Sequence, residues 1–488
     1  MTGTIVADSP TVDPASDLAA PPRKVDAGEQ IGRRFVAFLV FALPYLLVSA
    51  VLDLYFTLRS TTNIVFADTW SFVPMLGKTL SGHFSLGMLW DAHNENRQPF
   101  LRALFILSAR FDHFNVTHLR ILGIFVLLLE TAILLFGAFK LQHRYLRILV
   151  GVGIVLLTSS FGQWESMFLE ENSMFFLTVA GAASSFWLLD WALRAGISGS
   201  RWVRILPSIC CALVATLSLA GGLAVWPVLA LRTATYRRDR NLVKAGVAIA
   251  AFGFLETLIY AWNMPGGGIG QSTWAHEGPL ELTRFFLLCL GNSVFNVGTS
   301  GLRFDVGYVI GLVMLTGFAW SLWNLWRDRS AWREPVYAVG LSLQVFGFLQ
   351  VAFVEYGRIG MGISLAFGSR YTTLTQTLPI GILLCLGSVA DRSWVRIGRR
   401  RVGHRRMMFA RVGVFACLPL LALGALSTDH FQYDVIPGYH QNFVNLQRYM
   451  LSTRPLTDQQ LLAFEWVPSS IRSAEPILRH FDLNVYHH

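Results

Sequence analysis

Long apolar segments without charge are the feature that most restricts how this chain can fold. Phe35–Leu54 contains no charged residue before Asp53, and Ile121–Phe139 contains a single one, Glu130. A helix needs about 20 apolar residues to cross the roughly 30 Å hydrocarbon core of a bilayer. Because such segments recur along the chain, we predict an all-α polytopic membrane protein rather than a soluble globular enzyme.

The composition supports this class. Hydrophobic residues make up 53% of the 488 residues and charged residues 14%, whereas a soluble domain has about 25% charged residues. The net charge of +10 could suggest nucleic acid, but the Lys and Arg residues form short clusters between apolar segments, which is typical of cytoplasmic loops. We therefore expect no nucleic-acid partner. The cysteines lie within apolar segments, which indicates neither disulfides nor a metal site: Cys210, Cys211, Cys289, Cys385 and Cys417.

The distribution of Lys and Arg predicts a cytoplasmic N-terminus, an outer C-terminus and eleven spans. The expected spans are Phe35–Phe56, Leu119–Phe139, Ile148–Ser160, Ser173–Leu193, Ile205–Ala220, Leu223–Ala234, Ala245–Trp262, Val306–Trp326, Val336–Val354, Thr372–Ala390 and Val412–Leu426. Arg284–Ser300 is expected to be re-entrant or interfacial. If it crossed the membrane, Asp391–Arg411, with eight Arg, would lie outside.

Three parts follow from this topology. Residues 1–32 are rich in Pro, Ala, Asp and Thr and predict a disordered cytoplasmic tail. Residues 33–426 form the membrane domain, which begins with an uncleaved first span. Residues 427–488 predict a small outer segment that caps the outer face, with helices at Leu456–Leu461 and Ser469–His480.

A long first outer loop, residues 57–118, is the most informative region. Long loops in compact proteins are usually functional. Two amphipathic stretches in it predict helices along the membrane surface. They place apolar or small residues at helical spacing: Phe72, Met75, Leu76, Thr79 and Leu80 in one, and Leu101, Leu104, Phe105 and Leu107 in the other.

Polar and aromatic residues of this loop are candidate site residues: Asp68, Trp70, Lys78, Asp91, His93, Asn94, Glu95 and Arg97. Simpler roles are open for several of them. Asp68 could be a helix N-cap, and Glu95 could pair with Arg97 or Arg102. His93 has no His or Cys near it at zinc spacing, so we expect a surface hydrogen bond there and no metal site.

Two later outer patches add candidates. Trp164 and Glu165 belong to a short loop next to the membrane, where a carboxylate is costly and hence often functional; the alternative is a solvated loop. Arg358, Arg370 and Tyr371 form the other patch. An Arg guanidinium binds phosphate through two parallel hydrogen bonds, although Arg370 could instead extend from the interface towards water.

Short motifs along most of Phe35–Val485 fit one known plan. They are Asp68-x-Trp70, Leu89-Trp90, His93-Asn94-Glu95-Asn96-Arg97, Gln163-Trp164-Glu165, Gly222-Leu223-x-x-Trp226-Pro227 and Ser369-Arg370-Tyr371-Thr372-Thr373. With the early Asp in the long first outer loop, they resemble a bacterial branch of the GT-C superfamily, membrane glycosyltransferases that use polyprenyl-phosphate sugars. That branch often has a second Asp where Thr69 stands and a His where Asn96 stands.

The resemblance implies an inverting glycosyltransferase of the bacterial plasma membrane. It would move a sugar from a polyprenyl phosphate to a glycan or lipid acceptor of the cell envelope, on the outer face. The candidates for the general base are Asp68, Asp91, Glu95 and Glu165, and Asp68 is favoured because it follows soon after the first span and so stays near the membrane surface, where the donor phosphate must lie. The residues implied for the phosphate are Arg358, Arg370, Tyr371 and Lys78; those implied for the sugar and acceptor are Trp70, Asp91, His93, Asn94, Glu95, Arg97, Trp164 and Glu165. No cofactor is implied, and a divalent metal ion is compatible with the motifs without being indicated by them.

The chemistry of the residues agrees with this expectation. A polyprenyl phosphate is a good leaving group, so the reaction needs mainly a carboxylate to accept the acceptor's proton and cations to hold the phosphate. Two alternatives come from other classes. A flippase or transporter of lipid-linked glycans would carry ionisable residues within its spans and internal repeats. An O-antigen polymerase or ligase would have its largest outer loop late in the chain.

Overall fold

A computed structural model describes residues 27–194, 201–235, 240–264, 275–296, 301–396, 404–452, 457–462 and 468–487. Two compact units are distinguished, Met1–Phe41 and Ala42–His488. Helix α1 (Ala27–Ser60) starts in the first and continues in the second. Residues 1–26 of the predicted tail lie outside the described residues, and residues 27–32 belong to α1.

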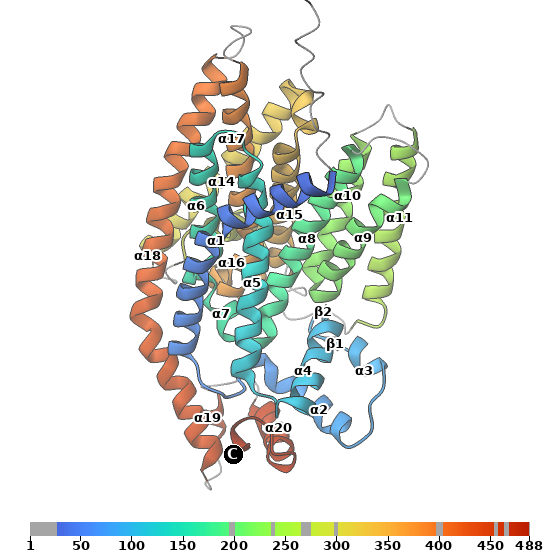
Figure 1. Cartoon of the computed structure of the whole chain (residues 1–488). Coiled ribbons are helices and arrows are strands. Elements are labelled where there is room, and N and C mark those ends of the chain that lie inside the picture. Colours follow the sequence, from blue (N-terminus) through green and yellow to red (C-terminus); the bar gives the residue numbers. More distant parts are fainter. Residues whose placement is uncertain are drawn as a thin grey trace, which may run out of the picture. The chain divides into compact units, whose positions relative to one another are not determined.

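The unit Ala42–His488 is a bundle of helices with smaller elements gathered at one end (Figure 1). After α1 the long and medium helices are α5 (Val116–Phe139), α6 (Arg144–Thr158), α8 (Ser173–Arg194), α9 (Arg201–Ser218), α10 (Val225–Ala234), α11 (Arg240–Ala261), α13 (Pro279–Asn292), α14 (Gly301–Arg327), α15 (Pro335–Arg358), α16 (Ser369–Thr375), α17 (Thr377–Arg396) and α18 (His404–Leu451). Short 3-10 helices connect several of them.

Nine helical stretches in the described ranges are long and apolar enough to cross a membrane. The chain is thus an all-α, multi-pass membrane protein, as its composition predicts. The two expected spans that were short in the sequence correspond to α9 and α10, and both are shorter than the other nine. The count of eleven therefore stays a prediction.

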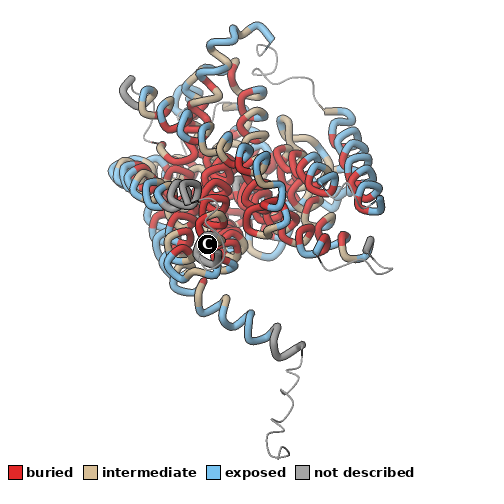
Figure 2. Tube along the Cα trace, turned by 90° about the horizontal axis from the view of Figure 1, so that it is seen from above, coloured by how far each residue is buried: buried red, intermediate tan, exposed pale blue. Residues whose placement is uncertain are grey.

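Helices α15 and α17 form the interior of the bundle. In the 18-residue apolar part of Ser369–Arg392, 94% of the residues are buried, whereas in that of Arg240–Ala261, at the periphery, 28% are buried. Figure 2 shows the buried positions gathered in the middle of the bundle and the exposed ones around it. Glycines permit the close approach: a Cβ on Gly381 would lie 2.3 Å from the carbonyl oxygen of Gly340. Small residues at such crossings are typical of helices packed within membranes.

Of the segment predicted to be re-entrant, residues 284–292 belong to the short helix α13, and residues 297–300 lie outside the described residues. The 14 residues of α13 span about 21 Å, which is less than the bilayer core. It packs on α14, where a Cβ on Gly291 would meet the Gly307 carbonyl. Asn292 at its end donates a hydrogen bond to the carbonyl of Gly368, and the carbonyl of Trp262, just after α11, accepts one from Arg97.

Arg97 and Gly368 both lie next to residues that line one cavity, described below. The chain therefore leaves α11 and reaches the end of α13 at the same end of the bundle. This geometry agrees with a connection between α11 and the end of α13 that does not cross the membrane.

The opposite end of the bundle gathers the other connections. The backbone N–H groups of Gln142 and His143 each donate to the Asp391 carboxylate at 2.8 Å. Arg392 forms an ion pair with Glu334 at 3.7 Å. The α5–α6, α14–α15 and α17 ends thus lie together, and this is the end that the Lys and Arg clusters predict to be cytoplasmic.

The long first loop folds into short elements. They are η1 (Ala67–Phe72), α2 (Val73–Leu80), α3 (Gly87–Trp90), the hairpin of β1 (Ala92–His93) and β2 (Asn96–Arg97), and α4 (Pro99–Phe111). Helix α20 (Pro468–His480) packs on α2, so that Gly77 lies against Ile477. The C-terminal segment and the first loop share one hydrophobic core.

Helix α18 is longer than the sequence suggested. It continues without a break through the expected boundary at residues 426 and 427 and ends at Leu451, although it contains Pro419 and Pro437. The two helices predicted for the tail correspond to α19 (Asp458–Leu461) and α20. The start of the C-terminal segment is therefore part of the last membrane helix itself.

The buried guanidinium of Arg120, in α5, connects several of these elements. It donates to the carbonyls of Thr62, Ile64 and Phe168 and to the Glu170 carboxylate, at distances between 2.5 and 3.0 Å. Both side chains of the Arg120–Glu170 ion pair are completely buried. A ring of α18, that of Phe443, lies over the guanidinium at 5.1 Å.

The sidedness of the loops gives the first testable prediction. In a Cys210→Ala background, Ser85→Cys in the outer loop should react with a membrane-impermeant maleimide in intact cells. Ser330→Cys, at the opposite end of the bundle, should react only after the membrane is permeabilised. Both positions are exposed. Labelling of both from outside would contradict the assignment of α13 as a helix that does not cross.

Candidate functional site

A cavity of about 290 Å³ opens where the first loop meets the helix bundle. Its wall comes from η1, the β1–β2 hairpin, η3 (Glu170–Asn172), α8, η4 (Ala220–Ala224), α15 and α16. The described residues that line it include three carboxylates, Asp68, Glu95 and Glu171, and two arginines, Arg358 and Arg370. The cavity thus combines bases with cations at one end of the membrane domain.

The other wall of the cavity is apolar. Side chains from α8, the start of η4, α15 and α16 form it: Phe175, Leu219, Leu223, Phe353, Val354 and Leu374. A cavity lined by charged groups and by a set of apolar side chains suits an amphiphilic ligand with an anionic group.

Arg370 lies between two carboxylates. Its Nη1 is 3.2 Å from Asp68 Oδ2, and its Nε is 3.6 Å from Glu165 Oε2. Glu165 also accepts a hydrogen bond from the backbone N–H of Arg370 at 2.9 Å. Glu165 is not among the cavity-lining residues, so it holds Arg370 from behind while Asp68 faces the cavity.

Arg358 has a similar arrangement at the end of α15. Its Nε donates to the Tyr371 hydroxyl at 2.6 Å, and its Nη2 forms an ion pair with Glu95. Glu95 reaches the cavity because Asn94-Glu95 is the two-residue turn of the β1–β2 hairpin. Asn94 has a φ of 51°, a left-handed conformation that Asn tolerates better than most residues.

Glu171 is a cavity residue that the sequence did not single out as a site residue. Its carboxylate accepts a hydrogen bond from the Thr69 hydroxyl at 3.2 Å. Burial raises the pKa of Glu171 well above its usual range, the charge of Asp68 adds to this, and Arg370 opposes it. The adjacent pair of glutamates in the sequence was the available signal, but their burial could not be read from it.

His93 faces the cavity from the hairpin. Its Nδ1 lies 3.1 Å from the Ser71 hydroxyl and its Nε2 3.3 Å from the Asn94 amide. Burial lowers the pKa of His93, and the nearby Asp68 opposes this shift. A neutral imidazole in this position can donate or accept one hydrogen bond from a ligand.

Several predicted residues lie elsewhere. Arg97 is buried and donates to the backbone carbonyls of Trp90, Tyr260 and Trp262, so it fixes the hairpin against the end of α11. Trp70 is completely buried in the shared core. Neither side chain lines the cavity.

Three more predicted residues are outside the cavity lining. Lys78 and Asp91 line a separate polar hollow in the first loop. Trp164 stacks on Tyr439 of α18, with ring centroids 4.4 Å apart. Conversely, the cavity contains two amides that the sequence did not highlight, Gln98 and Gln350; Gln350 donates to the Gly221 carbonyl at 2.7 Å.

Two neighbouring glutamates give a matched prediction on stability. The carboxyl of Glu171 has a raised pKa in the folded state, so ionisation favours the unfolded chain as the pH rises above about 4.3, the value for an unperturbed Glu. Glu171→Gln should therefore raise the melting temperature at pH 7.5 and have little effect at pH 4. Thermal unfolding in detergent at both pH values measures this difference.

Glu170→Gln is the matched control and should have the opposite sign at pH 7.5. It leaves the buried Arg120 charge without its partner, and breaking a buried ion pair costs about 3–5 kcal/mol. Equal effects of the two substitutions would contradict the assignment of different electrostatic roles to them.

Comparisons of the chain with models of known protein families and with curated proteins gave no match. The functional assignment therefore depends on the geometry of the cavity and on the motifs themselves.

Proposed function

We propose that this protein is a GT-C-type glycosyltransferase that takes its sugar from a polyprenyl phosphate. The observation that carries the proposal is the single cavity in which Asp68 and Glu95 face Arg358 and Arg370 next to an apolar wall. An anionic lipid-linked sugar needs cations for its phosphate, a base for the acceptor and an apolar path for its chain. The proposed location is the bacterial plasma membrane, with the cavity on the outer face.

The donor phosphate would be bound by Arg370, Arg358 and Tyr371. These residues come from the end of α15 and the start of α16 and lie next to the apolar wall. Each guanidinium can donate two parallel hydrogen bonds to phosphate oxygens. The polyprenyl chain would lie along Phe175, Phe353 and their neighbours, which belong to helices that cross the membrane.

In the proposed transfer, the acceptor hydroxyl gives its proton to the Asp68 carboxylate. Its oxygen attacks the anomeric carbon from the face opposite to the phosphate, and the bond from this carbon to the phosphate oxygen breaks. The leaving oxygen keeps the electron pair, and the arginines stabilise the resulting charge. A single displacement of this kind inverts the anomeric configuration.

Donor binding would also prepare the base. Without a donor, Arg370 is paired with Asp68 and Glu165. A phosphate that binds Arg370 competes with Asp68 for the same N–H donors, while Glu165 keeps its separate contact with the Arg370 backbone. Asp68 is thereby released to accept a proton only when the donor is in place.

The hairpin would present the acceptor. Glu95, Asn94 and His93 line the cavity and belong to the hairpin of the first loop. Hydrogen-bonding groups of this kind recognise sugar hydroxyls. Arg97, which fixes the hairpin to α11, would act by positioning these residues.

A flippase or transporter of lipid-linked glycans is the second candidate. It is favoured by Glu130, a carboxylate that is fully buried in α5 and lies 3.4 Å from the Gln376 amide. Ionisable groups within spans often mark transport paths. Translocation abolished by Glu130→Gln, together with transfer unaffected by Asp68→Asn, would favour this candidate.

The role of the base is tested by Asp68→Asn. The amide keeps the shape and one acceptor oxygen but removes the basicity, so turnover should fall by about 10²–10⁴-fold while donor affinity changes little. Sugar transfer in proteoliposomes measures turnover. Asp112→Asn, in the exposed part of the same loop, is the control and should keep full activity. Full activity of Asp68→Asn would show that the base has been misassigned.

Phosphate binding is tested at the arginines. Loss of one charge-assisted hydrogen bond costs about 1.5–3 kcal/mol, so Arg370→Ala or Arg358→Ala should weaken binding of a polyprenyl phosphate at least about tenfold. Arg370→Lys should restore binding only in part, because Lys lacks the planar pair of donors. Arg110→Ala, on the exposed surface of α4, is the control. Unchanged donor affinity in both alanine variants would exclude these residues as the phosphate site.

A further inference from the structure

The last residues of the chain fold back onto the first outer loop. Asn484 is buried, its backbone N–H donates to the His113 carbonyl at 2.6 Å, and its side chain donates to the Phe114 carbonyl at 3.2 Å. Its side-chain oxygen accepts from the Val65 N–H at 3.3 Å. This contact joins segments that lie at opposite ends of the sequence.

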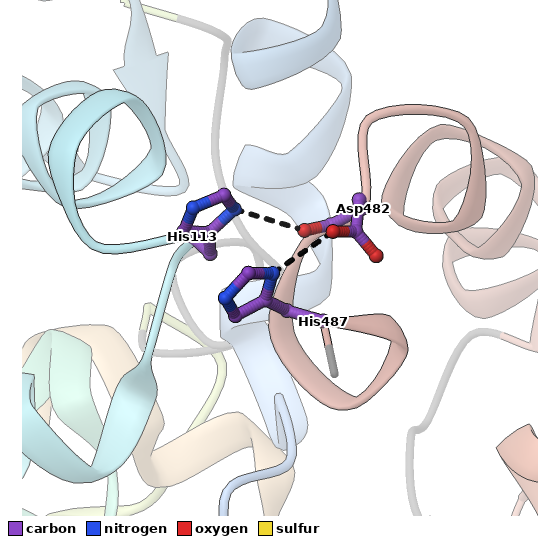
Figure 3. Close-up of side chains that lie close together, drawn as sticks. All are labelled: His113, Asp482 and His487. Atoms are coloured by element: carbon purple, nitrogen blue, oxygen red, sulfur yellow. Dashed lines mark hydrogen bonds and ion pairs between the residues drawn. The ribbon is translucent and has the colours of Figure 1, made fainter.

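Three potential metal ligands meet at the edge of this contact. They are His113, just after α4, and Asp482 and His487, after α20 (Figure 3). Their ligand atoms all lie within 4.8 Å of one another. His487 Nδ1 is 2.9 Å from Asp482 Oδ2, and His113 Nδ1 is 3.3 Å from the Asp482 carbonyl oxygen. Figure 3 shows a nitrogen of each ring directed at Asp482.

The two imidazole rings are stacked. Their centroids are 3.5 Å apart and their planes differ by 8°. The in-plane lone pairs of stacked, nearly parallel rings do not converge, so the two exposed rings must turn toward each other before both can bind one ion.

The backbone holds two of the ligands in an unusual conformation. His113 has a φ of 49° and Asp482 a φ of 52°. Left-handed conformations are unfavourable for residues other than glycine and persist where the surrounding structure imposes them. The Asn484 contacts with His113 and Phe114 impose this conformation on the loop side.

We propose that His113, Asp482 and His487 bind a Zn²⁺ ion that fastens the C-terminal segment to the first outer loop. Two imidazole nitrogens, one carboxylate oxygen and a water form a tetrahedral set that suits Zn²⁺. Ligands about 2.0–2.1 Å from zinc are roughly 3.4 Å apart, so the exposed side chains need to move only by about 1 Å or a little more. The site is distinct from the cavity and does not depend on the proposed transfer reaction.

The sequence alone could not predict this site. His113 and Asp482 are 369 residues apart, and the histidine at zinc-motif spacing from His113, His118, is not part of this cluster. Only the fold of the tail brings them together. A bound ion would cross-link the segment after α20, a helix that packs on α2, to the loop that precedes α5.

Zinc content of the full-length protein tests the proposal. Protein in detergent is treated with EDTA, incubated with ZnCl₂, desalted and analysed for bound metal, and we expect one Zn²⁺ per chain. Loss of groups that merely support a ligand weakens metal binding by about 10–100-fold, so loss of a ligand itself should weaken it at least about 100-fold. The variants are His113→Asn, Asp482→Asn and His487→Ala. Asn is chosen at the first two positions because it tolerates a positive φ.

Hydrogen exchange of Leu483–Tyr486 is the second readout. Zn²⁺ should slow exchange there in the wild type and not in the variants, and equal melting temperatures in EDTA show that the variants are folded. His118→Asn is the matched control, since His118 pairs with Asp112 as an exposed His–Asp pair. Retention of zinc by the variants at the wild-type level, or none retained by the wild type, would overturn the proposal.

Discussion

The arrangement of the candidate site depends on the buried ion pair of Arg120 and Glu170. Arg120 sits in α5 and donates to the carbonyls of Thr62 and Ile64, which lead to Asp68, and to the carboxylate of Glu170, which precedes Glu171. A buried guanidinium is costly unless all its donors are satisfied. Because its acceptors come from separate segments, the segments must be in place together for the charge to be stabilised.

The cavity itself follows from a similar balance of charge. Each of its arginines is paired with a carboxylate of the first loop, Arg370 with Asp68 and Arg358 with Glu95. The loop is thus drawn to α15 and α16 by the same groups that would bind substrate. If a phosphate binds these arginines, as proposed, it would weaken the loop's attachment, and ligand binding would be coupled to loop position.

The sequence predicted the membrane segments well because apolar length is a local property. It also identified Asp68, Glu95, Arg358 and Arg370, which the fold brings to one cavity. It could not separate these residues from Trp70 and from Arg97, Lys78 and Asp91, which have similar chemistry in the same loop. The two groups of residues differ in the burial and in the direction of their side chains: Trp70 is in the core, and Arg97 points to backbone carbonyls to which it donates hydrogen bonds. Both properties are set by contacts with distant segments.

The length of α18 shows a different kind of limit. The polar composition after Leu426 suggested that the helix had already ended, yet it continues to Leu451. Tertiary contacts compensate: Phe443 lies against Phe66 and over Arg120, and Leu446 and Met450 are buried in the shared core. These contacts outweigh the weak preference of the local sequence against a helix. They cannot be predicted from a local sequence pattern.

The continuity of α18 has a consequence for how this protein can change in length. The helix has 48 residues and is about 72 Å long. It packs in the membrane domain at one end and in the hydrophobic core shared with the first loop at the other. Inserting or deleting one residue between Leu421 and Phe443 would turn Phe443 by about 100° around the axis and move it by about 1.5 Å. Many substitutions along α18 can preserve its contacts, but a change of one residue in length displaces all of them together. The number of residues in α18 is therefore more strictly constrained than the identity of those residues.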